Sequence, residues 1–197
     1  MYLIIDAYLS NCIIERKNLK LLGMAALIIA SKGNEVNYPS LQSFISFSHY
    51  AYTLEELKDM EIKVIQELDY DILAPTADEF CSINAEYFKF TEIQKYFGEY
   101  FLDKSLLGYN LLKYKQSTMA FACCYIVIKF FNLNGSHLNV DDTNQEINSK
   151  EVKDCTKDLL SLMENLRGSF LVATKNKYMS DKYLNVSQLI EINLEII

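Results

Sequence analysis

The chain has 197 residues, half of them hydrophobic, and a formal net charge of −7. This length suits one domain or two small ones packed together, with enough apolar side chains for a substantial core. Its arginines are Arg16 and Arg167, so no basic stripe is available to displace counterions from a phosphate backbone. Composition therefore disfavours nucleic acids and anionic membranes as partners.

Residues that interrupt regular structure are scarce. Six glycines and two prolines leave little material for tight turns, whereas long segments rich in Leu, Ile, Lys and Glu are typical of helices. The sequence therefore predicts an all-α fold. The longest apolar stretches, 21–30 and 117–128, are shorter than the roughly 18 residues that a bilayer crossing needs. With no basic segment of a secretion signal at the start, we expect a soluble intracellular chain.

The first predicted core element is the helix at residues 21–30. It is apolar almost all round and rich in alanine, as expected for a helix enclosed by its neighbours. Lys32 would complement the helix dipole in the last turn, and Gly33 would take the left-handed position just beyond the end.

Capping boxes mark the starts of three later helices. Thr53, Thr76 and Thr91 are each followed three residues later by a glutamate or glutamine, so that each pair can satisfy orphan backbone donors reciprocally. A second enclosed helix is predicted at 119–128. Ser149 is expected to cap a further helix.

Two short matches at one spacing indicate an internal repeat. Met24-Ala-Ala matches Met119-Ala-Phe, and residues 56–60 match 151–155, in both cases with an offset of 95 positions. In the second copy, a helix at 76–90 precedes the helix that begins near Thr91. The counterpart of that helix in the first copy would lie before the first residue of the chain.

The first copy is therefore expected to begin at its second helix, which means that the sequence is a fragment or that the fold has lost an element. In either case an apolar face near Ile4, Ile5 and Tyr8 would lack a cover. We expect the chain to be poorly soluble on its own.

Three segments resemble the cyclin family. Residues 2–32 and 52–76 are similar to the cyclin box, and residues 177–191, KYMSDKYLNVSQLIE, resemble the end of the second cyclin fold in the mitotic A/B group. The resemblance implies two tandem cyclin-box helical repeats, in agreement with the internal repeat, with the first helix of the N-terminal box missing. Residues 1–74 would form this incomplete box, helices two to five, and 75–197 the C-terminal cyclin fold with its tail.

The resemblance also implies a function. The chain would be a regulatory subunit that binds and activates a cyclin-dependent protein kinase and so controls cell-cycle progression, at the G2/M transition. It would work in the nucleus and cytoplasm, with no catalytic activity and no cofactor, metal or small-molecule ligand. In the family, the missing helix carries the groove that docks short substrate motifs, so no residue here inherits that role.

The family's kinase-binding surface transfers to the positions that match it. Lys32 and Glu61 align with the pair that, in cyclins, meets the backbone around the kinase's C-helix. The remaining kinase-binding positions are apolar at Ile65, Tyr70 and Ile72 and acidic at Glu35.

The loop after the central helix departs from the family pattern. Gly33 replaces a bulky aromatic residue and Asn34 replaces an acid. Asn37 is an extra residue, and Ser40 stands where a second proline is usual. The loop would therefore bind its kinase less tightly or in a different way.

The residues themselves also allow plainer interpretations of this surface. Glu61 lies within an apolar stripe, where an unpaired carboxylate is costly to bury, so it needs a partner or must reach solvent at the edge of the stripe. Tyr70 and Ile72 are either core residues of a turn or part of an exposed binding patch. The positions 95 residues after Lys32 and Glu61 are Val127 and Thr156. A charge pair needed only for folding would be expected in both copies.

Rival functions have little support in the sequence. His49 and His137 stand alone, and neither a phosphate-binding loop nor a nucleophile elbow is present, which argues against an enzyme. Five cysteines without a Cys-x-x-Cys pair indicate buried, reduced thiols, and the run at 141–142 predicts a solvated acidic loop. A nucleic-acid-binding relative would need a basic face and a zinc ribbon. A transcriptional cyclin, or a cyclin-like scaffold that does not activate a kinase, stays open as an alternative.

Overall fold

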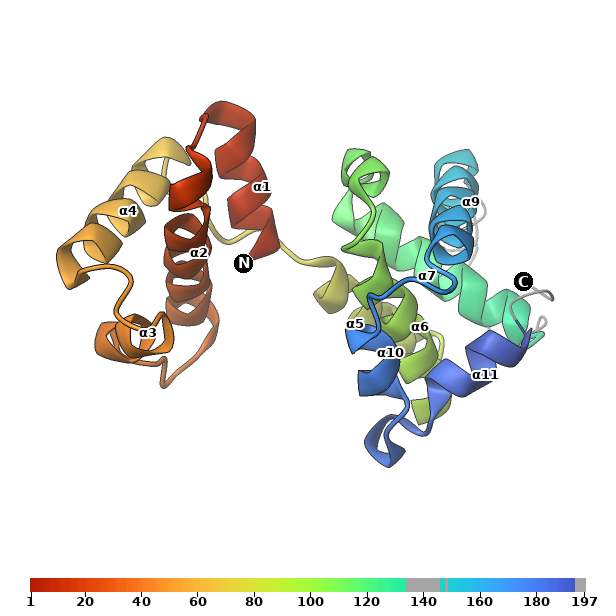
Figure 1. The fold of residues 1–197 in the computed structure, drawn as a ribbon. Coiled ribbons are helices and arrows are strands. Elements are labelled where there is room, and N and C mark those ends of the chain that lie inside the picture. Colours follow the sequence, from red (N-terminus) through yellow and green to blue (C-terminus); the bar gives the residue numbers. More distant parts are fainter. Residues whose placement is uncertain (134–145, 148, 194–197) are drawn as a thin grey trace. The chain divides into compact units, whose positions relative to one another are not determined.

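The computed structural model describes residues 1–133, 146, 147 and 149–193, and this part of the chain is helical (Figure 1). It contains ten α-helices and three short 3-10 helices and no strand, which confirms the all-α prediction. None of these helices combines the length and apolar character that crossing a membrane requires. The chain divides into two compact units, unit 1 at residues 1–74 and unit 2 at residues 75–197.

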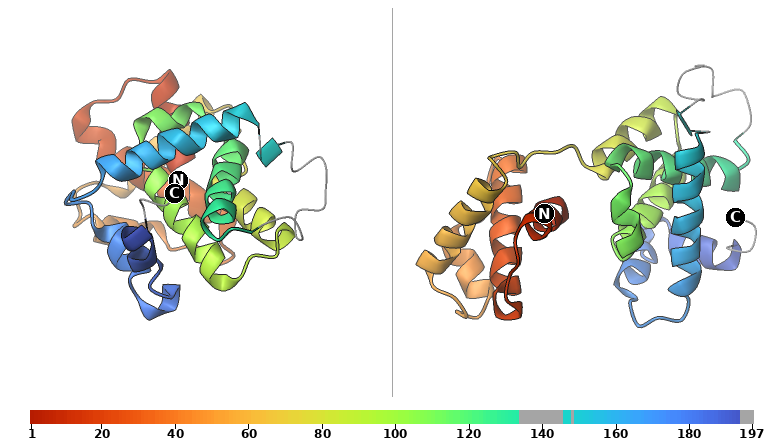
Figure 2. Two further views of the ribbon diagram at one scale, coloured as in Figure 1. Left: turned by 90° about the vertical axis from the view of Figure 1, so that its right-hand side faces the viewer. Right: turned by 90° about the horizontal axis from the view of Figure 1, so that it is seen from above.

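Unit 1 is built around one central helix. In Figure 1 and in the right-hand view of Figure 2, α2 runs between α4 and α1, and both flanking helices contact it. A 3-10 turn, η1, leads into α2. The helices are α1 (Tyr2–Asn11), η1 (Arg16–Asn18), α2 (Leu19–Asn34), α3 (Leu41–Phe47) and α4 (Leu54–Glu67).

Two apolar clusters lie on different sides of α2. One joins α2 to α3 and α4 through residues such as Ile28 and Leu57, and the other joins α2 to α1 and α4 through Leu22, Tyr8 and Val64. Because both clusters use α2, this helix is buried on most sides, as its sequence predicts.

The expectation of an uncovered face on α1 is wrong. Ile4 and Tyr8 are buried and Ile5 is half-buried, because α1 lies against α2 and α4 and places these side chains in the second cluster. The exposed apolar residues of α1 are Tyr2 and Leu9, which face away from that cluster.

Unit 2 has its own central helix, α7, which contacts α5, α6 and α9. Aromatic rings add to its core, with the ring centroids of Phe97 and Phe130 4.5 Å apart. The described elements are α5 (Ala77–Tyr87), α6 (Glu92–Ser105), η2 (Tyr109–Lys113), α7 (Gln116–Phe130), α9 (Lys150–Asn165), α10 (Ala173–Tyr178), η3 (Asp181–Tyr183) and α11 (Val186–Asn193).

The predicted repeat is present in the packing. The set α1, α2 and α4 corresponds to α6, α7 and α9, and in each set the middle helix contacts the other two. Within residues 1–74, all of which the structure describes, no helix corresponds to α5.

The predicted helix starts are also found. Thr53 N–H donates to Glu56 Oε2 at 2.7 Å, and Glu56 N–H donates to Thr53 Oγ1 at 3.2 Å. Thr76 forms the same reciprocal box with its glutamate, and Thr91 N–H donates to the side-chain oxygen of its glutamine. Ser149 Oγ accepts from the backbone three residues later.

Four helices end in a left-handed residue that is not glycine. His49, Asp69, Lys89 and Asn132 have φ between 48° and 57° and follow α3, α4, α5 and α7. At each end, the next residue's N–H bonds to a carbonyl five positions earlier, as in Tyr70 N–H to Ile65 O at 3.0 Å. This is the Schellman arrangement, in which glycine is usual at the left-handed position.

Candidate functional site

Lys32 and Glu61 meet on unit 1. Lys32 Nζ lies 2.6 Å from Glu61 Oε1, so the last turn of α2 is joined to the middle of α4 by an ion pair. The structure brings together the two charged residues that the sequence singles out.

The two members of the pair differ in exposure. Glu61 is only 8% exposed, since it lies on the side of α4 that packs on α2. The Lys32 side chain keeps 36% of its surface open. The Glu61 side chain keeps 11% of its surface exposed, so it is mostly buried rather than extended into solvent at the edge of its stripe, and Lys32 compensates its burial. The ammonium has three N–H groups, and one of them is used for Glu61.

Apolar side chains lie beside the pair. Ile65 and Ile72 are half-buried, packed against the cluster that contains Ile29 and Val64. Tyr70 is 71% exposed. The sequence left open whether these residues are core residues or part of an exposed patch. In the structure the two isoleucines belong partly to the core, and the tyrosine is on the surface.

Tyr70 owes its place to the end of α4. Asp69 N–H bonds to Gln66 O and Tyr70 N–H to Ile65 O, and both Asp69 and Tyr70 have positive φ. This reversal stops the helix and turns the chain toward the end of unit 1. The backbone of Tyr70 is therefore fixed by its hydrogen bond to Ile65 O.

Gly33 does not take the left-handed position that the sequence predicts. The helix α2 continues through Asn34, whose side-chain amide donates to Ala30 O, and ends at Glu35 with φ −111°. Gly33 is helical, and its lack of a side chain leaves room for Leu73. A Cβ at this position would lie 2.6 Å from a methyl carbon of Leu73.

Leu73 is the residue that sequence reasoning missed. It is 64% exposed and lies against Gly33, in space that a side chain at position 33 would need. Two features of the sequence could have indicated this contact: the glycine at position 33 and the apolar residues just before Pro75. We define the charge-pair surface as Lys32, Glu35, Glu61, Ile65, Tyr70, Ile72 and Leu73.

Glu35 lies at the rim of this surface. It is exposed and its N–H closes the last turn of α2 on Ser31 O. Beyond it the loop exposes Val36, at 96%, and Tyr38, at 51%. No bond in the described part of the chain joins the Glu35 carboxylate to the pair, so it contributes negative charge rather than a fixed contact.

The corresponding place in unit 2 carries no charge. Val127 is fully buried in α7, and Thr156 of α9 is 6% exposed, with its hydroxyl donating to Val152 O at 2.8 Å. Unit 2 thus shows that this helix pair can pack without a charge pair. The Lys32–Glu61 contact is a feature of unit 1 and not of the repeat.

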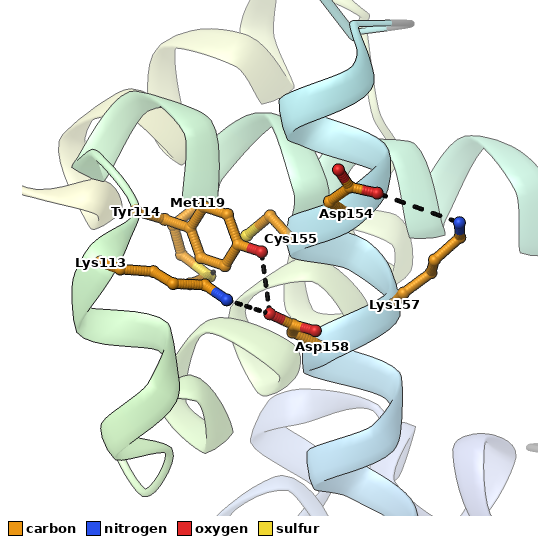
Figure 3. Close-up of polar contacts among 7 residues, drawn as sticks. All are labelled: Lys113, Tyr114, Met119, Asp154, Cys155, Lys157 and Asp158. Carbon is orange, nitrogen blue, oxygen red and sulfur yellow. Dashed lines mark hydrogen bonds and ion pairs between the residues drawn. The ribbon is translucent and has the colours of Figure 1, made fainter.

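Unit 2 has a different polar contact on α9 (Figure 3). Lys113 Nζ and Tyr114 Oη both converge on Asp158 Oδ2, each at 2.8 Å. The hydrogen bonds from Lys113 and then Tyr114 hold the pKa of Asp158 below its ordinary value. This cluster fastens the segment before α7 to α9. It also supplies an ion pair outside the charge-pair surface, with side chains more exposed than those of Lys32 and Glu61.

The sequence also contains residue types that can bind metals or take part in catalysis. The described residues contain no group of three or more His, Cys, Asp or Glu side chains placed to hold a metal ion. His49 is exposed at the end of α3. His137 and the acidic run at 141–142 lie outside the described residues. Cys12 is half-buried and the other four cysteines are buried, with no disulfide among them.

Comparisons with known proteins identify the class to which this helical repeat belongs. Residues 2–73 match the cyclin N-terminal domain, and residues 75–191 match the cyclin C-terminal domain. The chain belongs to the cyclin family. Cyclins are regulatory subunits and not enzymes, and members of the family bind cyclin-dependent kinases.

The more similar relatives are A- and B-type cyclins, as the sequence predicts. Cyclin-A1-1 of Oryza sativa subsp. japonica is 30% identical over 197 residues, covering 93% of this chain and 37% of the relative. G2/mitotic-specific cyclin-B2 of Homo sapiens is 26% identical over 195 residues, covering 96% of this chain and 48% of the relative. The chain therefore spans less than half the length of these two relatives.

A solved structure shows the same fold. The X-ray structure of a viral cyclin from herpesvirus saimiri superposes with a TM-score of 0.66 at 19% identity, covering 85% of this chain and 73% of that one. The prediction of two tandem cyclin repeats is confirmed.

Proposed function

We propose that the chain is the regulatory subunit of a cyclin-dependent protein kinase, which it binds through the charge-pair surface of unit 1 and activates at the G2/M transition. Family membership and the A- and B-type relatives support the class and the timing. The observation that carries the proposal is the Lys32–Glu61 ion pair, which is partly exposed to solvent and bordered by apolar side chains. The corresponding place in unit 2 has no such pair.

The pair is suited to hold a partner's backbone. Lys32 keeps N–H donors and Glu61 keeps a second carboxylate oxygen, so together they can pair with carbonyl and amide groups at a loop or helix end. The two groups already bind each other, and their relative placement is fixed before the partner arrives. Preorganisation of this kind reduces the ordering cost of binding.

Apolar contact must supply most of the affinity. Moving a kinase from about one per cent active to 99 per cent requires a preference of roughly 5.5 kcal/mol for the active state. A partly exposed ion pair contributes about 1 kcal/mol or less. Tyr70 and Leu73, both well exposed, are the candidate anchors, while Lys32 and Glu61 fix the register.

The subunit would act on the conformation of its partner. By holding the C-helix of the kinase, it would favour the arrangement in which the kinase's own Lys–Glu ion pair forms. Catalysis stays in the kinase. We also propose that the protein acts in the nucleus and cytoplasm, a location that fluorescence imaging of the tagged chain tests.

The test replaces the pair with the residues that unit 2 uses. Lys32→Val with Glu61→Thr should weaken binding to a cyclin-dependent kinase by at least about tenfold, because it removes both polar contacts to the partner. Isothermal titration calorimetry measures binding, and phosphorylation of histone-type substrates measures activation. Lys113→Ala with Asp158→Ala, which removes the ion pair of unit 2, is the matched control and should change neither.

Four results would count against the proposal. Unchanged binding by the unit 1 variant would show that the kinase uses another surface. An equal loss in the unit 2 control would indicate a general effect on folding. Binding without activation would favour a cyclin-like scaffold, and activation confined to polymerase-tail substrates would favour a transcriptional cyclin.

A further inference from the structure

Three of the five cysteines meet where α5 packs on α7 in unit 2 (Figure 1). Cys81 belongs to α5, and Cys123 and Cys124 belong to α7. The Cys81 thiol donates a weak hydrogen bond to Ala120 O at 3.9 Å. Residues 123 and 124 follow residue 120 by three and four positions, so their side chains share its face of the helix. All three thiols therefore gather at one contact between the two helices.

A cavity of about 270 Å³ gives access to these thiols. It lies among α5, α6 and α7, and Cys81, Cys123 and Cys124 are all part of its lining. Ser82 and Glu86, which also line it, are exposed, so the cavity reaches the surface of unit 2. Its volume is sufficient for several molecules of the size of water. A small polar molecule can therefore reach Cys81 without unfolding of the helices.

Cys81 differs chemically from its two neighbours. Hydrogen bonds from Cys123 and then Cys124 hold the pKa of the Cys81 thiol below its ordinary value, although burial acts in the opposite direction. The same bonds to Cys81, together with burial, raise the pKa values of Cys123 and Cys124. One thiolate is thus favoured beside two protonated thiols. A thiolate is the reactive form of cysteine, and a nearby thiol can resolve its oxidised form.

The other two cysteines have a different chemical environment. Burial raises the pKa of Cys155, whose sulfur lies 4.0 Å from Met119 Sδ (Figure 3). Burial, followed by a hydrogen bond to Glu67 and the negative charge of that residue, raises the pKa of Cys12. Cys12 is nonetheless more exposed than Cys81. Exposure and thiol chemistry therefore make opposite predictions about which of these two cysteines reacts first.

We propose that Cys81 is a site of oxidation by hydrogen peroxide, and that it then forms a disulfide with Cys123 or Cys124. In the first step the Cys81 sulfur takes a hydroxyl group from hydrogen peroxide, the O–O bond breaks, and the products are a sulfenic acid and water. In the second step the neighbouring sulfur bonds to the Cys81 sulfur and displaces the hydroxyl group, which leaves as water with the thiol's proton. Over both steps the two thiols lose two electrons and two protons, and hydrogen peroxide is reduced to two molecules of water.

The disulfide would cross-link unit 2 by tying α5 to α7. In surroundings that keep thiols reduced, a bond of this kind is transient, and a dithiol reductant reverses it. Oxidation at Cys81 is thus a reversible modification that responds to peroxide. It involves no residue of the charge-pair surface, which lies in unit 1.

The test follows all five thiols of the unaltered, folded chain by mass spectrometry. The protein is treated with hydrogen peroxide, and the remaining thiols are blocked with N-ethylmaleimide in denaturant. Trypsin then releases residues 64–89, which contain Cys81, and residues 116–129, which contain Cys123 and Cys124. These two peptides should be joined by a disulfide that dithiothreitol reverses. Cys81 should be oxidised at least about tenfold more than Cys12 or Cys155, because the fraction of thiolate governs the rate.

Variants separate the roles of the three thiols. Cys81→Ala should prevent the cross-link, and Cys123→Ala and Cys124→Ala made singly identify which of the two is the partner of Cys81. With both replaced, oxidation of Cys81 should stop at the sulfenic acid, which dimedone traps. Cys155→Ala is the matched control, since it removes another buried thiol of unit 2, and it should leave the yield of the cross-link within about twofold of the wild type. The measurement on the unaltered chain needs no substitution, so it remains decisive where a variant does not fold.

Three outcomes would overturn the proposal. They are oxidation of Cys12 before Cys81, a cross-link that forms only after the chain is unfolded in urea, and two separate peptides at a peroxide concentration that oxidises Cys12. The first would show that exposure alone decides which thiol reacts. The second would show that the cavity does not admit peroxide, and the third that the sulfur atoms are badly placed for a disulfide. None of these measurements uses the kinase, so they test this proposal independently of the proposed function.

Discussion

Units 1 and 2 use the same three-helix arrangement and differ where the central helix meets the last one. Unit 1 has the ion pair Lys32–Glu61 there, partly open to solvent, and unit 2 has Val127 and Thr156, both buried. A repeat that packs well without charges does not need them for stability. The difference shows that packing of the central helix on the last one does not require a charge pair, which supports the proposed role of the unit 1 pair in binding. Each prediction below tests this comparison.

The largest effect is expected when a charge is placed in unit 2. Val127→Lys puts an ammonium at a fully buried site without a carboxylate, which should destabilise unit 2 by about 3–5 kcal/mol. Hydrogen exchange with mass spectrometry reads peptides of each unit separately. Leu27→Lys, at a 41% exposed position of α2, is the control and should change stability by less than about 0.5 kcal/mol.

Breaking the unit 1 pair on one side should have a smaller effect. Lys32→Val leaves the buried Glu61 carboxylate unpaired and should destabilise unit 1 by about 1–3 kcal/mol. Adding Glu61→Thr should restore most of this loss, because both residues then match those of unit 2. Chemical denaturation with exchange on peptides from residues 1–74 checks both steps. A double variant less stable than the single one would mean that unit 1 needs its charges to fold.

The two central helices also differ in glycine content, since α2 contains Gly23 and Gly33 and α7 has none. A Cβ at Gly23 meets no atom within 4 Å, so Gly23→Ala should stabilise unit 1 by roughly 1 kcal/mol through helix propensity. Gly33→Ala should gain less, because Leu73 must move. Thermal unfolding of the two variants compares them, and equal gains would show that Leu73 does not depend on Gly33.

The smallest effect is expected at the polar cluster of unit 2. Hydrogen bonds from Lys113 and Tyr114 lower the pKa of Asp158 in the folded protein, so their stabilisation is present above the unfolded carboxyl pKa of about 4 and is lost as the pH falls through the lower folded value. Asp158→Asn should therefore lower the melting temperature slightly at pH 7, by about 2 °C. The difference should disappear near pH 2. A difference in melting temperature that persists at pH 2 would show that the Asp158→Asn effect comes from packing and not from the charge of Asp158.

Much of the fold could be predicted because its signals are local. The capping residues Thr53 and Thr76, the apolar run of α2 and the spacing of the repeat each depend on a short stretch of sequence. The cover of Ile4 and Tyr8 could not be predicted, because it depends on how α1 lies against two helices distant in sequence.

The candidate site was predicted in part for the same reason. Residue types and a family resemblance were enough to pair Lys32 with Glu61. They could not show that Glu61 is the buried partner, that Gly33 stays helical, or that Leu73 rests on it, since these facts depend on packing across α2 and the segment after α4.

The left-handed residues at four helix ends bear on how far this fold can be made to resist heat. An L-residue with a side chain loses about 1–2 kcal/mol in that conformation, less for Asn and Asp, and glycine avoids the loss. His49 and Lys89 are exposed and lie outside the charge-pair surface. Replacing them with glycine would relieve steric crowding in the main chain and leave the charge-pair surface unchanged. These two helix ends are therefore the first positions to change in order to obtain a more thermostable variant.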